Sequence, residues 1–283
     1  MKNEKNRLPA WLRRNIPDLL DTQSVGRILS EGGLNTVCRS ARCPNRAECF
    51  KKGTATFLIL GSICTRNCRF CNISPGEPLE ADPEEPKRVA AAAIAMKLKY
   101  AVVTSVTRDD LPDGGAGFFA ETVLLLHQGG IKVEILTPDF EGKEASLKIV
   151  ASASPDVFNH NLETVPRLYS EARPQADYRR SLEVLRMFKE LAPSIPTKSG
   201  LMLGLGEERE EVIRVFEDLV ENHCDRLTLG QYIPPSREHL PVFRYLPPEE
   251  FEEWGELARK AGFKQVFSGP LVRSSYQAET AFE

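Results

Sequence analysis

The sequence lacks the marks of several large classes of protein. No apolar run among its 283 residues approaches the length of a membrane-spanning helix. The N-terminal segment Met1–Arg7 has no apolar core of a secretory signal, and its acidic residue is atypical of a transit peptide. These absences predict a cytoplasmic protein whose thiols stay reduced.

A large excess of charge of one sign is also missing. The net charge of −3 argues against a general nucleic-acid coat, although Arg173, Arg179, Arg180 and Arg186 could form a local basic patch. The sequence contains neither a metalloprotease helix motif nor a G-x-x-x-x-G-K phosphate loop. We therefore expect neither a nucleic acid nor a membrane as a partner.

Cysteine is the residue type that stands out, because six of the seven cysteines form two triplets. The triplets are Cys38, Cys43 and Cys49 (C-x4-C-x5-C), and Cys64, Cys68 and Cys71 (C-x3-C-x2-C). A structural zinc site closes with four protein ligands, so each triplet alone is one ligand short. A cubane iron–sulfur cluster held by three thiolates leaves one iron open to another ligand. The triplets thus favour two [4Fe–4S] clusters, of which at least one does chemistry.

Other interpretations of the cysteines remain open. Disulfides would require an oxidising compartment, and they usually staple much smaller domains. Zinc could draw four thiolates from across both triplets. An electron-transfer ferredoxin module normally uses four cysteines per cluster, and it would leave most of the chain unexplained. The odd cysteine, Cys224, is predicted to be a buried and inert thiol.

Strand and helix patterns alternate along the chain from residue 54 onward. The expected strands are short apolar runs without strict alternation, as in strands covered on both faces. They are Thr56–Gly61, Tyr100–Val106, Ile131–Thr137, Asp156–Asn161, Thr197–Leu205, Arg226–Ile233 and Gln265–Val272. The expected helices are Pro83–Lys99, Ala116–Gln128, Lys143–Ala153, Glu163–Ala172, Tyr178–Leu191, Glu208–Asn222 and Glu249–Ala261. This repeated order predicts an α/β fold with a parallel sheet wound into a barrel or an open half-barrel.

Ligands of such folds bind at the carboxyl ends of the strands. Cys64–Cys71 follow the first strand. After the second strand we expect cofactor contacts from Thr104, Ser105, Asp109, Gly114 and Gly115. The two glycines would let the backbone approach a ligand, although a plain turn and helix cap explains them equally well.

The fourth strand ends in polar residues suited to a ribose or an adenine. Among them, Asn161 and Glu163 are predicted to bind the cofactor. His160 and His239 are plausible contacts whose roles stay unassigned. His127 and His223 are expected to be surface or packing residues, because both lie in helix patterns.

The run Cys64–Cys71, with an aromatic residue before its last cysteine, resembles the signature of the radical S-adenosylmethionine (SAM) enzymes. Several other segments together resemble one family within them, lipoyl synthase, over about Trp11–Ala278. The segments are C-x4-C-x5-C, CTRNCRFC, TSVTRDDLPDGGA (104–116), VEILTPDF (133–140), FNHNLET (158–164), KSGLMLGLGE (198–207), GQYIPPSREHLPV (230–242) and GPLVRSSYQA (269–278). Gln277 and Ala278 depart from the family pattern, in which histidine often follows the tyrosine.

The resemblance implies a partial (β/α)6-type parallel barrel of the radical SAM kind at 54–264. An N-terminal extension (1–53) would carry the auxiliary-cluster cysteines, and 265–283 would form a C-terminal strand and the RSSY segment. Cys64, Cys68 and Cys71 would hold a [4Fe–4S] cluster that binds SAM through its open iron. One electron would then cleave SAM to methionine and a 5′-deoxyadenosyl radical.

The implied reaction is insertion of two sulfur atoms at carbons six and eight of an octanoyl-lysine. An unactivated carbon has no acidic proton, so acid–base catalysis cannot start this chemistry and a radical is required. The resemblance also implies protein partners. They are the E2 lipoyl domains and the glycine-cleavage H protein, an electron donor such as flavodoxin or ferredoxin, and an iron–sulfur carrier that rebuilds a spent cluster.

Cys38, Cys43 and Cys49 would hold an auxiliary [4Fe–4S] cluster that donates the sulfur. By the resemblance, its fourth ligand is a serine of RSSY, preferably Ser275 and otherwise Ser274, and Arg273 would neutralise charge nearby. An alkoxide suits soft iron–sulfide surroundings poorly, so it should leave readily. Two alternatives are a biotin-synthase-like or methylthio-transferring radical enzyme, and an iron–sulfur redox module without catalysis.

Overall fold

The structure is a computed structural model that describes residues 8–13, 23–51, 55–276 and 278. One sheet organises it. Seven parallel strands lie side by side in the order β2 (Thr56–Ile59), β5 (Tyr100–Ser105), β6 (Lys132–Leu136), β7 (Val157–Asn159), β8 (Thr197–Leu203), β9 (Arg226–Gln231) and β10 (Gln265–Ser268). A short strand, β1 (Asn35–Thr36), pairs antiparallel with β2.

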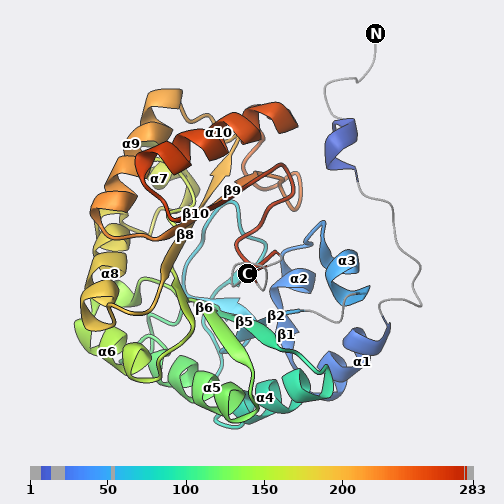
Figure 1. Cartoon of the computed structure of the whole chain (residues 1–283). Helices are drawn as coiled ribbons and strands as arrows, with labels where there is room; N and C mark the ends of the chain where they lie inside the picture. Colours follow the sequence, from blue (N-terminus) through green and yellow to red (C-terminus); the bar gives the residue numbers. More distant parts are fainter. Residues whose placement is uncertain (1–7, 14–22, 52–54, 277, 279–283) are drawn as a thin grey trace.

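Helices cover the outer face of this sheet, and Figure 1 shows them as a crescent around the strands. They are α4 (Glu85–Ala95), α5 (Ala116–Gln128), α6 (Glu144–Ser152), α8 (Tyr178–Leu191), α9 (Arg209–Glu221) and α10 (Pro248–Ala261). Among the described residues no pairing joins β1 to β10, so the sheet is an open barrel. The predicted α/β class and the parallel barrel are confirmed, and all seven expected strands are present.

Shorter elements lie outside the main sheet. Before β1 lie η1 (Ala10–Leu12) and α1 (Gln23–Glu31), and after it come α2 (Val37–Ser40) and α3 (Arg46–Lys51). A two-stranded ladder of β3 (Ile63–Cys64) and β4 (Ser74–Pro75) follows β2. The remaining pieces are η3 (Phe140–Gly142), η4 (Pro166–Leu168) and α7 (Tyr169–Ala172).

The prediction of one helix over Glu163–Ala172 is wrong. The backbone of Glu163 has a φ of 69°, and this residue forms a bridge with Leu201 of β8. Its N–H donates to the Gly200 carbonyl oxygen over 2.9 Å, which holds the chain against the sheet. Helical structure is therefore delayed to η4 and α7. The segment instead serves as a wall of the barrel mouth.

Helix boundaries follow their local chemistry. Asp177 caps α8 by accepting a hydrogen bond from the Arg180 N–H over 2.7 Å. Helix α10 begins at Pro248, whose missing N–H costs nothing there, and ends before Gly262, which has a φ of 119°. These start and stop signals explain why the expected and observed helices agree closely in these regions.

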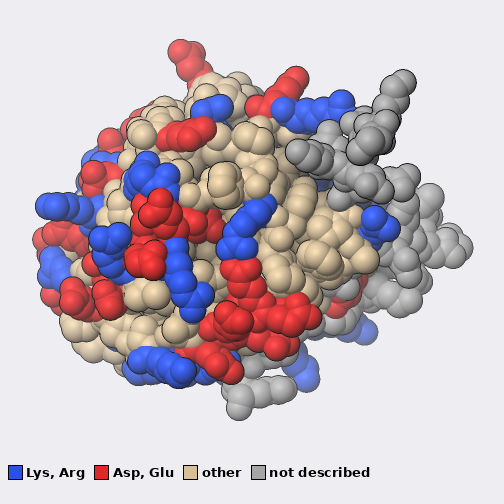
Figure 2. All heavy atoms as spheres, turned by 90° about the horizontal axis from the view of Figure 1, so that it is seen from above, with Lys and Arg blue, Asp and Glu red and all other residues tan. Residues whose placement is uncertain are grey.

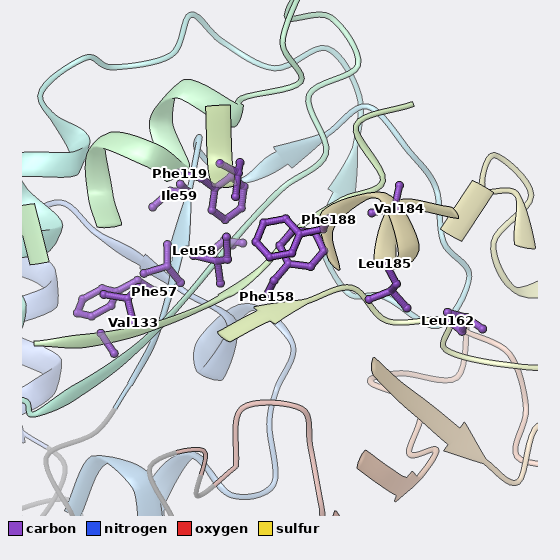
Figure 3. Packing of buried hydrophobic residues seen from close by; sticks show 14 of the residues in the cluster. Phe57, Leu58, Ile59, Phe119, Val133, Phe158, Leu162, Val184, Leu185 and Phe188 are labelled. Atoms are coloured by element: carbon purple, nitrogen blue, oxygen red, sulfur yellow. The ribbon is translucent and has the colours of Figure 1, made fainter. Parts of the chain in front are cut away.

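The core lies between the sheet and the helices. Phe158 of β7 stacks on Phe188 of α8, with ring centroids 3.8 Å apart and planes 7° apart, and Figure 3 shows the pair among aliphatic neighbours. Both rings are fully buried. This contact fixes α8 against the middle of the sheet, next to the strands that end in the polar residues of the mouth.

Basic and acidic side chains are interspersed on the face in Figure 2. This mixture agrees with the small net charge of −3. Among the described residues, no helix has the length and apolar character needed to cross a membrane.

We expect F188A to lower the free energy of unfolding by about 3–5 kcal/mol, because it removes a stacked ring and leaves a cavity. Urea denaturation of the cluster-free chain measures this loss. L124A is the control, since the Leu124 side chain of α5 is 51% exposed. Equal loss in both variants would contradict the described packing.

Candidate active site

The second cysteine triplet lies on the loop after β2, at the carboxyl end of the sheet. Cys64 ends β3, and its sulfur accepts N–H groups from Arg66 (3.4 Å) and Thr107 (3.3 Å). The Cys71 N–H donates to the Cys68 carbonyl oxygen over 3.0 Å, so the end of the loop is a tight turn. Backbone groups at the end of β5 therefore hold the loop, together with backbone hydrogen bonds within the loop itself.

Arg66, which lies between Cys64 and Cys68, holds this loop in place through hydrogen bonds to two aspartates. Its guanidinium donates to both Asp109 oxygens over 2.8 Å and to the two Asp139 oxygens over 3.0 and 2.6 Å. Asp139 also pairs with Arg180 over 2.9 Å. Although burial alone would raise the pKa of Asp139, its hydrogen bonds and charge contact with Arg66 hold that pKa well below its usual range. The loop is thus tied to the ends of β5 and β6 through charged pairs.

Burial disfavours the thiolate form of two cysteines of this triplet, Cys68 and Cys71, when no metal is bound. Burial raises the pKa of Cys68, and it raises that of Cys71 to about 12, with further raising by the charges of Cys68 and Cys64. Iron binds the thiolate, so cluster formation at this loop must release the protons of these thiols.

The first triplet lies on the short helices outside the sheet. Cys38 is in α2, which Thr36 caps by accepting from the Arg39 N–H over 3.2 Å. Cys43 is in the following turn, and Cys49 is in α3, where its N–H donates to the Asn45 carbonyl oxygen over 3.0 Å. Burial, together with the charge of Cys43, raises the pKa of Cys38.

The two triplets lie on touching segments of the chain. The Asn72 amide, next to Cys71, donates to the Ser40 carbonyl oxygen over 2.6 Å. The loop after β9 contacts both sides. In this loop, His239 Nε2 lies 3.1 Å from the carbonyl oxygen of Cys71. The Pro235 carbonyl oxygen of the same loop accepts a hydrogen bond from Arg42 over 3.2 Å. Both cysteine regions therefore border one mouth of the barrel.

All seven cysteines lie in described parts of the chain and none forms a disulfide, so the disulfide interpretation is wrong. The residues that the structure describes also bring no three Cys, His, Asp or Glu side chains around a single-ion site. Zinc thus has no preformed site there. The sulfurs of Cys64, Cys68 and Cys71 lie within electrostatic reach of one another, and a cubane cluster is held by thiolates on different irons. Cys224 is a buried thiol as predicted, and burial raises its pKa.

The segment after β10 returns across the barrel mouth toward α2 and α3 (Figure 1). The Asn45 amide donates to the Leu271 carbonyl oxygen over 2.7 Å, and the Tyr276 hydroxyl donates to Glu48 over 2.9 Å. Arg273 lies within electrostatic reach of both Cys43 and Glu163. The RSSY residues are thus beside the first triplet, as the resemblance implies.

The two serines have different surroundings. The Ser274 hydroxyl accepts from the Asn161 amide over 2.8 Å inside the barrel, and a Cβ added to Gly200 would lie 2.8 Å from it. Ser275 is half-buried, and the next residue, Tyr276, contacts α3. Ser274 therefore has a partner in the barrel, and this supports the preference for Ser275 as the ligand.

The residues predicted after β5 divide into two groups. The Asp109 carboxylate is paired with Arg66 and the Thr104 hydroxyl donates to the Leu136 carbonyl oxygen over 2.7 Å, so both have structural partners. Gly114 and Gly115 have φ values of 64° and 89°, and an added Cβ on either would meet a side chain, Phe140 or Leu60. The geometry supports the turn-and-cap alternative for the glycines.

Ser105 forms the second group, because its hydroxyl is a buried polar atom without a hydrogen-bond partner among the described residues. Other atoms of this kind include the Thr137 hydroxyl, His160 Nε2 and Arg173 Nε. Burial, together with the nearby Arg173, lowers the pKa of His160 to about 4, so its imidazole is neutral near pH 7. Its Nδ1 then donates to the Thr137 carbonyl oxygen over 2.9 Å and leaves Nε2 as an acceptor.

These orphan groups fit a polar cofactor at the strand ends. An acceptor such as Nε2 suits an ammonium or a ribose hydroxyl. Asn161 and Glu163 lie at the same end, joined by a 3.0 Å hydrogen bond. A half-open pocket of about 370 Å³ is lined by Leu168, Glu171, Ala172, Leu205, Leu240, Pro241, Val242 and Phe243, and Phe70 packs against part of this lining.

Sequence reasoning missed several residues of this site. Arg66 lies between Cys64 and Cys68, and this position in the ligand spacing was the one signal that the sequence offered for it. Asp139 lies in the VEILTPDF segment, and its pairing partner could not be known before the fold. His239 was left unassigned, and the structure places its ring against the Cys71 carbonyl group.

Comparisons with known proteins agree with this site. The family model described as the Radical SAM superfamily matches residues 58–219. A lipoyl synthase of Syntrophotalea carbinolica is 56% identical over 274 residues, which cover 96% of this chain and 89% of that protein. A lipoyl synthase of Caldanaerobacter subterraneus subsp. tengcongensis is 55% identical over 274 residues, 96% of each chain.

Solved structures share the fold at lower identity. Streptococcus suis SuiB bound to precursor peptide SuiA has a TM-score of 0.59 and 16% identity, and the match covers 80% of this chain and 52% of that one. Methylornithine synthase (PylB) has a TM-score of 0.50 and 17% identity, with 90% and 84% covered. The fold and the cysteine loop define a radical SAM protein. Within that superfamily, the chain belongs to the lipoyl synthase family.

We expect R66Q to lower stability by about 3–5 kcal/mol, because it leaves the Asp109 and Asp139 carboxylates without their main partner. It should also reduce the iron retained at Cys64, Cys68 and Cys71 after anaerobic reconstitution. R69Q is the matched control, since Arg69 lies in the same loop but its side chain is 50% exposed. Urea denaturation measures the stability, and iron analysis measures the retained iron. Equal losses in R66Q and R69Q would contradict the role of Arg66 in holding the loop.

Proposed function

We propose that this chain inserts two sulfur atoms into a protein-bound octanoyl-lysine and so forms the lipoyl group. Two [4Fe–4S] clusters and SAM are the cofactors of its family. Two cysteine triplets at one barrel mouth carry this proposal, because radical formation and sulfur donation must occur within reach of one substrate chain.

Bound at these sites, the cofactors would supply hydrogen abstraction from unactivated carbons and sulfur for the carbon radicals. Cys64, Cys68 and Cys71 would hold the first cluster, on the loop braced by Arg66. Ser105, Asn161 and Glu163 would orient SAM at the strand ends. The other predicted SAM contacts would act indirectly, by shaping the backbone of the loop after β5. They are Thr104, Asp109, Gly114 and Gly115.

Cys38, Cys43 and Cys49 would hold the auxiliary cluster, with Ser275 as its fourth ligand. The contacts of Leu271 and Tyr276 with Asn45 and Glu48 support this placement. Arg273, near both Cys43 and Glu163, would balance the negative charge of thiolates and sulfide in this region. A serine oxygen is a hard ligand among soft ones, so it would be released readily.

The same proposal names the partners. The substrate would be carried by an E2 lipoyl domain or the glycine-cleavage H protein. Electrons would come from flavodoxin or ferredoxin, and an iron–sulfur carrier would rebuild the spent cluster. Seven cysteines without disulfides support a reducing compartment, and we propose the cytoplasm.

Mass spectrometry tests the reaction. An octanoylated carrier is incubated anaerobically with the reconstituted protein, SAM and reductant, and 5′-deoxyadenosine is measured in the same samples. We expect the carrier to gain the mass of two sulfur atoms, because under these reducing conditions each of two C–H groups becomes C–SH. Deoxyadenosine without a modified carrier would point to another radical SAM substrate, and absence of both would favour a redox module.

Single cysteine substitutions separate the two clusters. C64A should abolish formation of 5′-deoxyadenosine, since it removes a ligand of the radical site. C43A should keep deoxyadenosine formation and lose the doubly sulfurated product, because only the sulfur source is impaired. C224A, a buried thiol outside both triplets, serves as the control. A lipoyl product from C43A at the wild-type level would contradict the auxiliary-cluster role.

A further inference from the structure

A buried lysine holds the C-terminal segment inside the barrel. The Lys198 side chain, on β8, is 2% exposed. Its ammonium donates to the Glu134 carboxylate oxygens over 2.9 and 3.1 Å and to the Ser274 carbonyl oxygen over 2.6 Å. An ammonium has three donors, so each has a partner in this arrangement.

Glu134, from β6, is fixed in turn by its neighbours. Its carboxylate accepts from the Tyr100 hydroxyl and from the Asn159 amide, each over 3.0 Å. Side chains from β5, β6 and β7 therefore set the position of the Lys198 ammonium. Because two of its donors are committed to Glu134, the third is directed at the backbone of residue 274.

The sheet also leaves room for this backbone. An added Cβ at Gly230 of β9 would clash with the Val272 carbonyl oxygen, and one at Gly200 of β8 would crowd the Ser274 hydroxyl. Asn161 contacts that same hydroxyl. The segment before Ser275 is thus seated in a fitted slot between two strands. When it leaves the slot, one buried donor of Lys198 loses its partner.

We propose that Lys198 is a positioning residue for the sulfur-donor site. By holding the Ser274 carbonyl group against the barrel wall, it presents the following residue, Ser275, to Cys38, Cys43 and Cys49. This inference rests on the proposed function, because it assigns the ligand role to Ser275. Lys198 touches neither cysteine triplet through any described contact, and its effect on chemistry runs through the segment that it anchors.

The test uses the full chain with K198M and E134Q combined. The double substitution removes the anchor without leaving a buried carboxylate unpaired, so the barrel should still fold. K189M is the matched control, since Lys189 pairs with Asp225 over 2.8 Å away from the mouth. Hydrogen exchange of the cluster-free chain is measured by mass spectrometry over residues 269–276. We expect exchange there to accelerate on the order of tenfold in the double variant alone.

The second readout is the number of 5′-deoxyadenosine molecules formed per sulfurated product after reconstitution. A misplaced ligand should raise this ratio on the order of tenfold, whereas general destabilisation would lower both products together. In an S275A background, K198M with E134Q should add little to the ratio, because both changes act on one contact.

The outcomes separate the two claims. Unchanged exchange over 269–276 would overturn the anchor whatever the enzyme does. Faster exchange with an unchanged product ratio would overturn the positioning role while the proposed function stands. A normal ratio in S275A alone would remove the ligand role of Ser275, and the inference that rests on it would fail with that part of the proposed function.

Discussion

The path of the C-terminal segment across the barrel mouth is the constraint on which the rest of the site depends. Its backbone and side chains are held by Lys198, Asn161 and Asn45, from three distant parts of the chain. Buried polar groups are costly when unpaired, so these contacts favour one seated position. That position brings Arg273 within electrostatic reach of Cys43 of the first triplet.

The two cysteine triplets are attached to the central sheet in different ways. Cys64, Cys68 and Cys71 follow a strand of the central sheet, and Arg66 locks their loop to two carboxylates. Cys38 and Cys49 lie on short helices outside the sheet, tied to it through β1 and the returning C-terminal segment. Charged pairs thus tie the second triplet to the strand ends, whereas one short strand and the C-terminal segment tie the first triplet to the barrel.

The sequence allowed the fold to be predicted well where local signals and packing agree. Seven strands and the helices with clear caps, such as α8 and α10, were predicted because their periodicity and end residues are local properties. The helix expected over Glu163–Ala172 failed because pairing of Glu163 with β8 overrode its helical pattern. The cysteine triplets were readable from spacing alone. Arg66, Lys198 and the separate environments of Ser274 and Ser275 depend on contacts between residues far apart in the chain, which spacing does not encode.

An anaerobic crystal structure of the reconstituted protein with SAM tests the central claim most directly. The account predicts Ser275 Oγ bound to an iron of the cluster on Cys38, Cys43 and Cys49, and Ser274 Oγ still paired with Asn161 inside the barrel. The second cluster would lie on Cys64, Cys68 and Cys71 across the same mouth. Iron bound to Ser274, or a C-terminal segment displaced from the slot beside Lys198, would contradict the account.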